Sequence, residues 1–317
     1  MFTRIIVPLD GTRFAEVALA PACELSRVFG AKLIITRAVP PYGFPYAVEG
    51  ALPPVGLAEI DTYDEKQQIV EAADTADAYL HTIAEKLRVA GYNAELLVEL
   101  AIPGTAISQA AAHEHADLIV MSSHLRWKVP VQTMTSATLD VLVQSRVPLL
   151  AWRVADELTE SDIPTDAPAV VARPETPIIV PLDGSILAES ALPTAQKLAR
   201  GFGAYIVLVR AVEREAEVGD GLAYLQRIRA EIMQEGVYAQ CVCRTGSPLS
   251  VIERVWREYN GSLVVMASRG RLGPYGTFFG STAARMLELA EAPVLVVRPP
   301  DIVAIETLGV AEERTAQ

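Results

Sequence analysis

The sequence is poor in cysteine and in basic residues. Three cysteines among 317 residues are too few for a disulfide framework. Cys241 and Cys243 lie two residues apart in an expected strand, so they share one face, where packing explains them better than a metal ion. Lys and Arg number 27 against 39 Asp and Glu, which gives a net charge of −12. This composition argues against a nucleic-acid partner, because neutralising phosphates requires a basic face.

Long apolar runs and histidine clusters are also missing. No apolar run approaches the roughly 20 residues of a membrane span, and the first residues form an expected strand without the features of a secretion signal. We therefore expect a cytoplasmic protein that binds no membrane. His113 and His115 lie two apart on an expected helix, so their side chains point about 200° apart. They cannot share one metal ion unaided, and no metal site is predicted.

The chain contains an internal repeat. Hydrophobic residues make up 51% of the sequence, which is enough to bury large cores. Residues 7–12 read VPLDGT and residues 180–185 read VPLDGS, an offset of 173. Later in each half the offset is 145, as for Pro103 and Pro248. The difference, 173 − 145 = 28, predicts a 28-residue insertion in the first half, at about residues 40–92. The sequence therefore predicts a duplicated domain.

Each half alternates short β-branched runs with longer amphipathic stretches, which is typical of an α/β fold with a parallel sheet flanked by helices. In the second half the expected strands are residues 178–181, 204–210, 237–243, 263–267 and 294–298. The expected helices are residues 185–202, 217–234, 248–258 and 281–290, and in the first-half insertion about 61–90. We expect domains at 1–153 and 175–299, a linker at 154–174 and a fraying tail at 300–317.

Ligands bind at the carboxyl ends of the strands in such sheets, so the residues after the first and fourth strands of the second half form the candidate site. Asp183 could accept hydrogen bonds from a base amino group or a sugar hydroxyl. Glycines would let the backbone approach a phosphate at the start of a helix, and Arg269 or Arg271 could supply countercharge. The same residues also fit a tight turn and helix caps that need no ligand.

The candidate ligand-binding residues share a position at these strand ends or at the following helix start. They are Pro181, Leu182, Asp183, Gly184, Ser185, Ala211, Val212, Met266, Ala267, Ser268, Arg269, Gly270, Arg271, Gly280, Ser281 and Thr282. No catalytic residue is predicted, because no paired carboxylates or general base stand near the loop.

Both halves resemble the universal stress protein family. Nucleotide-binding members of this family carry Gly-x-x-Gly, nine residues, and then Gly-Ser or Gly-Thr after strand four. Residues 267–270, nine further residues and Gly280-Ser281 fit that pattern, with Ala267 in place of the first glycine. The resemblance implies that Asp183 contacts the adenine side and that the backbone of Ala211 and Val212 reads the base.

The same resemblance implies a fold and an assembly. In each half it implies an open five-stranded parallel sheet of order 3-2-1-4-5, of the adenine nucleotide alpha hydrolase-like type. It further implies pairing of domains through their fifth strands, which gives an internal pseudo-dimer and a homodimer of chains. Catalysis is not implied, because some members bind ATP or AMP and others bind neither.

The first half departs from the phosphate-loop pattern. Leu125 and Thr135 stand where the second half has Gly270 and Gly280. Leucine adopts positive φ only at a cost, and its side chain would fill space that a phosphate needs. Asp10 is retained, but we expect the first domain to act as a structural partner.

Three functions remain open. The leading hypothesis is a stress-response or regulatory protein that binds ATP or AMP, with or without Mg²⁺, in the second domain, rather than a turnover enzyme. The alternatives are a ligand-free scaffold for dimerisation and partner recruitment, and a slow ATPase or phosphoryl-transfer enzyme.

Overall fold

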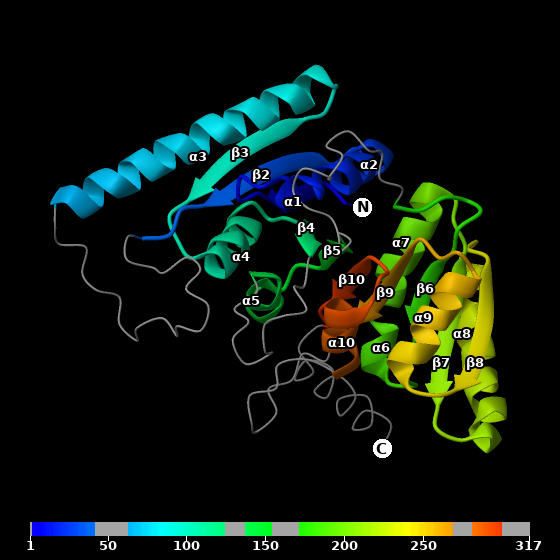
Figure 1. Cartoon of the computed structure of the whole chain (residues 1–317). Helices are drawn as coiled ribbons and strands as arrows, with labels where there is room; N and C mark the ends of the chain where they lie inside the picture. The colour runs from blue at the N-terminus through cyan, green and yellow to red at the C-terminus, as the bar shows by residue number, and fades with distance from the viewer. Residues whose placement is uncertain (1, 42–62, 124–136, 154–170, 269–280, 300–317) are drawn as a thin grey trace, which may run out of the picture. The chain divides into compact units, whose positions relative to one another are not determined.

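The computed structural model describes residues 2–41, 63–123, 137–153, 171–268 and 281–299 (Figure 1). The chain divides into two compact units, Met1–Val171 and Ala172–Gln317. Residues 154–170 of the predicted linker (154–174) and the predicted tail at 300–317 lie outside the described residues. In the described parts of the chain, every helix is too short or too polar to cross a membrane.

The first unit is a parallel sheet of order β3-β2-β1-β4-β5. Its strands are β1 (Arg4–Pro8), β2 (Lys32–Ala38), β3 (Ala94–Glu99), β4 (Leu118–Ser123) and β5 (Leu149–Arg153). Its helices are α1 (Arg13–Glu16), α2 (Leu19–Phe29), α3 (Tyr63–Val89), α4 (Pro103–His113) and α5 (Ala137–Gln144). Right-handed crossovers place α2 and α3 on one face and α4 and α5 on the other, and Figure 1 shows α3 and α4 on opposite sides of the sheet.

The second unit repeats this arrangement, with strand order β8-β7-β6-β9-β10. Its strands are β6 (Ile178–Pro181), β7 (Ile206–Val212), β8 (Ala239–Thr245), β9 (Leu263–Ala267) and β10 (Val294–Val297). Its helices are α6 (Ile186–Glu189), α7 (Leu192–Phe202), a 3-10 turn (Glu215–Glu217), α8 (Val218–Gln234), α9 (Pro248–Glu258) and α10 (Ser281–Leu289). Numbered within each unit, both orders are 3-2-1-4-5, which confirms the predicted fold class.

The cores are centred on the first strand of each unit. Ile5, Ile6 and Val7 of β1 are fully buried, and so are Ile178, Ile179 and Val180 of β6. A parallel strand covered by helices on both faces must be apolar on both, which explains these continuous aliphatic runs. The loop after each of these strands lies at the carboxyl edge of its sheet, where the candidate site was predicted.

The boundaries of three predicted elements were wrong. The single helix expected at residues 185–202 is two helices, α6 and α7. A continuous helix would place Pro193 in its interior, where the ring clashes with the carbonyl of Glu189, whereas Pro193 in the first turn of α7 needs no partner for its missing N–H. The strands expected at 204–210 and 237–243 lie two residues further on, because β7 starts pairing at Ile206, opposite Ile178 of β6.

The predicted insertion helix is α3, and its extent can be compared with that of α8. Both end at the same repeat position, since 234 − 145 = 89, but α8 begins at the equivalent of residue 73 and α3 at residue 63. Ten of the 28 additional residues therefore lengthen the helix at its N-terminus. The other 18 precede α3 in the chain.

The histidine pair of α4 is not arranged as expected. His113 is the last residue of the helix, and His115 follows it with a φ of +48°. A left-handed residue cannot continue a right-handed helix, so the two side chains do not share a helical surface.

Candidate functional site

The loop after β6 is a tight turn that presents Asp183. Gly184 has a φ of +89°, a conformation that side-chain-bearing residues rarely adopt. The Asp183 Oδ1 accepts hydrogen bonds from the Ser185 N–H at 2.9 Å and from its Oγ at 2.6 Å. Ser185 caps α6 by accepting from the N–H of Ala188 at 3.2 Å. The turn and cap that the sequence allowed are thus present, and they fix the direction of the Asp183 side chain.

An arginine, a tyrosine and a glutamate support this turn. A Cβ on Gly184 would lie 3.0 Å from Nη1 of Arg210, so the guanidinium packs directly on the glycine. The Cζ of Arg210 lies 4.9 Å from the ring centre of Tyr224, whose hydroxyl donates to Glu189 at 2.8 Å. Arg227 also contacts the Glu189 carboxylate, at 3.3 Å. Burial, followed by the Glu189 hydrogen bond and charge, raises the pKa of Tyr224, which keeps the phenol protonated as a donor. We call Arg210, Tyr224 and Glu189 the brace.

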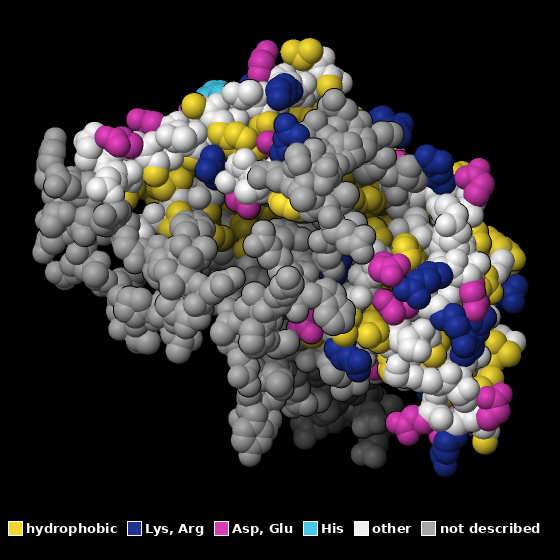
Figure 2. Space-filling model, in the orientation of Figure 1, with side chains coloured by type: hydrophobic (Ala, Val, Ile, Leu, Met, Phe, Trp, Pro, Cys, Tyr) yellow, Lys and Arg dark blue, Asp and Glu magenta, His cyan; other side chains and the backbone are white. Residues whose placement is uncertain are grey.

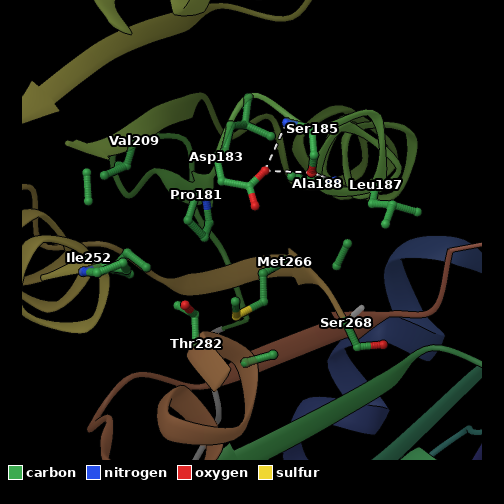
Figure 3. A pocket seen from close by; sticks show the side chains of 15 residues that line it. Pro181, Asp183, Ser185, Leu187, Ala188, Val209, Ile252, Met266, Ser268 and Thr282 are labelled. Carbon is green, nitrogen blue, oxygen red and sulfur yellow. Dashed lines mark hydrogen bonds between the residues drawn. The ribbon is translucent and has the colours of Figure 1, made fainter. Parts of the chain in front are cut away.

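A cavity of about 170 Å³ opens beside Asp183 (Figure 3). Ile252 and Met266 face it from α9 and β9, and Thr282 from the first turn of α10. Its walls are Pro181, Leu182, Asp183, Ser185, Leu187, Ala188, Val209, Ala211, Pro248, Ile252, Met266, Ala267, Ser268, Thr282 and Ala283. Eleven of these residues are apolar, and Asp183, Ser185, Ser268 and Thr282 contribute polar side chains, a mixture that is common in small-molecule sites.

The structure brings together nine of the sixteen predicted site residues. These are Pro181, Leu182, Asp183, Ser185, Ala211, Met266, Ala267, Ser268 and Thr282. Gly184 contacts the brace instead, Val212 is buried outside the lining, and Ser281 begins α10. The predictions for Arg269, Gly270, Arg271 and Gly280 lie outside the described residues.

Several wall residues were missed by the sequence reasoning. They are Leu187, Ala188, Val209, Pro248, Ile252 and Ala283. Pro248 and Ile252 lie on α9, whose first turn reaches the strand ends, and both have identical counterparts in the first half. That internal identity was the signal that could have identified them.

The first unit has a cavity at the same place. It measures about 560 Å³ and is lined by Pro8, Leu9, Asp10, Ala15, Arg37, Ala38, Val39, Pro40, Ala72, Pro103, Ile107, Met121, Ser122, Ala137 and Thr138. With the offsets of 173 and 145, eleven positions line both cavities, and eight of these carry the same residue. The identical pairs are Pro8/Pro181, Leu9/Leu182, Asp10/Asp183, Ala15/Ala188, Ala38/Ala211, Pro103/Pro248, Ile107/Ile252 and Met121/Met266.

The turn and its support are also duplicated. Asp10 Oδ1 accepts from the Thr12 N–H at 2.8 Å and from its hydroxyl at 2.6 Å. The Arg37 guanidinium lies 5.2 Å from the ring centre of Tyr79, and the Tyr79 hydroxyl donates to Glu16 at 2.8 Å. Burial, followed by that hydrogen bond and by nearby negative charge, raises the pKa of Tyr79 as well. Arg37, Tyr79 and Glu16 therefore form a second brace.

Comparison with known proteins agrees with this duplicated architecture. The sequence model described as the universal stress protein family matches residues 1–153 and 176–298. The chain belongs to the universal stress protein family. Universal stress protein YxiE of Bacillus subtilis is 28% identical over 145 residues, covering 38% of this chain and 97% of that one. Universal stress protein MJ0531 of Methanocaldococcus jannaschii is 26% identical over 139 residues, covering 39% and 82%.

A solved structure matches both units of this universal stress protein together. A universal stress protein from Archaeoglobus fulgidus superposes with a TM-score of 0.67 at 20% identity, covering 93% of this chain and 98% of that one. A putative universal stress protein from Pseudomonas aeruginosa gives 0.62 at 18% identity, covering 96% and 95%. At such identities the likeness shows a shared fold.

The described side chains of this universal stress protein show which chemical groups line the second cavity. Asp183 is the single ionisable residue among the described residues that line the second cavity, so these walls offer a hydrogen-bond acceptor but no acid–base pair. Among described residues, no three His, Cys, Asp or Glu side chains lie close enough to hold a metal ion. Acidic and basic side chains are interspersed over the visible described surface of the second unit (Figure 2).

The two neighbouring cysteines of β8 are packing residues. Cys243 Sγ would lie 2.5 Å from a Cβ on Gly221, so the thiol packs against α8. Burial raises the pKa of both Cys241 and Cys243, which disfavours the reactive thiolate.

Proposed function

We propose that the second unit binds an adenine nucleotide, ATP or AMP, and that the protein acts as a stress-response or regulatory binding protein rather than as a turnover enzyme. The observation that carries this proposal is the cavity beside Asp183, enclosed by the ends of β6, β7 and β9 and by the first turn of α10. This is the edge of an open parallel sheet at which ligands bind.

The apolar walls of the cavity form the proposed binding surface for the base. Leu182, Ile252 and Met266 present apolar surface against which a purine ring can pack. The Asp183 carboxylate, whose direction the turn fixes, can accept a hydrogen bond from an amino group or from a ribose hydroxyl. A charge-assisted bond of this kind is about twice as strong as a neutral one, so Asp183 is the side chain expected to matter most.

The start of α10 is the proposed binding site for the phosphates. The helix begins at Ser281, and Thr282 lines the cavity. Unpaired N–H groups and the helix dipole favour an anion at such an end. The neighbouring glycines and arginines that the sequence singles out lie outside the described residues, and their composition suits a phosphate. Ligand cavities usually measure about 300–1,000 Å³, so the 170 Å³ enclosed here corresponds to part of a nucleotide.

Calorimetric titration of the whole chain with ATP, ADP and AMP, with and without Mg²⁺, tests the proposal. We expect binding that weakens about tenfold in Asp183→Asn, because losing one charge-assisted hydrogen bond removes about 1.4 kcal/mol. Asp10→Asn is the matched control, because it makes the same chemical change at the equivalent turn of the other unit, and it should leave ATP affinity unchanged. The function is wrong if the native chain binds none of these nucleotides.

We also propose how the protein assembles. We infer pairing of the two domains through their fifth strands, a homodimer of chains and a cytoplasmic location, all from the family resemblance. Light scattering of the purified chain checks the dimer, and a single-chain mass at micromolar concentration would contradict it.

A further inference from the structure

We infer that the first unit carries a second ligand site of its own and that this site takes a nucleoside without a phosphate. The choice of a nucleoside rests on the function proposed for the second unit. The existence of the site rests on the first unit's own cavity, on its duplicated turn and on hydroxyl groups that the second unit lacks.

The first unit keeps a cavity at the position of the proposed site of the second unit. It is the larger of the two, about 560 Å³ against about 170 Å³. Eight of its walls are identical to those of the second cavity. A volume of this size lies within the usual range of ligand sites.

The turn and brace are maintained across the insertion. The 28 additional residues separate Arg37 from Tyr79 in the chain, yet the guanidinium still lies over the ring, at 5.2 Å against 4.9 Å in the second unit. Gly11 keeps a φ of +92° next to Arg37. The first unit therefore presents Asp10 at its cavity with the same hydrogen bonds that orient Asp183.

The first unit also adds hydroxyl groups at two matched positions of the lining. Ser122 and Thr138 line the first cavity where the second has Ala267 and Ala283. A hydroxyl can donate to and accept from the ring nitrogens and hydroxyls of a ligand, whereas an alanine methyl can do neither.

The phosphate is excluded by three sequence differences. Leu125 and Thr135 replace the glycines at the two loop positions, and Ala137 replaces Thr282 at the start of the last helix. Arg37 and Asp10 both line the first cavity, so its described charges balance. The features shared with the second unit are those of the base and sugar end, which is why we assign a nucleoside.

Titration of the whole chain with adenosine, alone and after saturation with ATP, tests the inference. We expect one adenosine site per chain that persists in the presence of ATP. Its affinity should be unchanged in Asp183→Asn and about tenfold weaker in Asp10→Asn, because that change removes one charge-assisted hydrogen bond. Thr138→Ala, which removes a lining hydroxyl and introduces the residue that the second unit has at this position, should weaken adenosine binding about tenfold and leave ATP binding unchanged. The circular dichroism and unfolding midpoint of each variant show whether it folds, and Ser122→Ala, the same kind of exchange at the other hydroxyl position, provides a further variant.

Three results would overturn the inference. Adenosine fails to bind, or it competes with ATP for a single site that Asp183→Asn weakens, or AMP binds the Asp10-dependent site as tightly as adenosine does. Failure of the proposed function is read separately, from ATP binding to the native chain and to Asp183→Asn. The two conclusions can therefore stand or fall independently.

Discussion

Replacing Gly184 by alanine perturbs the turn and the brace together. The φ of +89° costs a side-chain-bearing residue about 1–2 kcal/mol. The new Cβ would lie 3.0 Å from the Arg210 guanidinium, which must move away from the Tyr224 ring. Losing a partly exposed cation–π contact removes a further ~0.5–1 kcal/mol. We therefore expect Gly184→Ala to lower the free energy of unfolding by about 1.5–3 kcal/mol.

Gly236→Ala is the matched control in the same unit. Gly236 has a φ of +81°, and nothing lies within 4 Å of its would-be Cβ, so only the backbone strain of about 1–2 kcal/mol applies. Urea unfolding of both variants measures the difference, which at a slope of about 2 kcal/mol/M displaces the midpoint by roughly 0.25–0.5 M. ATP affinity should fall in Gly184→Ala and not in Gly236→Ala. Equal destabilisation together with unchanged affinity in both would refute a brace that supports the Asp183 turn.

Two further predictions concern buried ionisable groups. Tyr224→Phe removes the donor to Glu189 and should lower the free energy of unfolding by about 1 kcal/mol in urea titrations. Because the folded-state pKa of Tyr224 is raised, native stability should decline as pH rises above the ordinary tyrosine value near 10, and less steeply in the variant; a parallel decline would contradict this. Burial raises the pKa of Cys23 from 9.0 to about 11, so iodoacetamide at pH 8 should alkylate the native thiol about 100-fold more slowly than the unfolded one, as mass spectrometry can follow.

Much of the fold was predictable because the repeat is preserved in sequence. Strands β6 and β9 were located correctly from their aliphatic runs. A strand that is buried on both faces of the sheet must be apolar at every position, which makes it easy to recognise in the sequence. The shift of β7 and β8 by two residues was not predictable locally, because pairing with β6 decides where the ladder begins. The break between α6 and α7 is signalled in the sequence by Pro193, which fits the first turn of a helix but not its interior.

The candidate site was predictable where it is contiguous in sequence and was missed where it is assembled from distant elements. The Asp183 turn follows from one tripeptide and a strand end. The brace joins residues of α6, β7 and α8, and no local pattern connects them. Their identity with Glu16, Arg37 and Tyr79 across the repeat is the signal that could have revealed them.

Helix α3 connects its N-terminal extension to the wall of the first cavity. Its first ten residues have no helical counterpart in the second unit and form a rod about 15 Å long, at 1.5 Å per residue. Most of the described side chains of this rod face solvent, and Ala72, its last residue, lines the cavity. No break interrupts the helix between this rod and Tyr79 of the brace. A displacement of the rod would therefore be transmitted to the cavity wall at Ala72, because the helix is continuous between them.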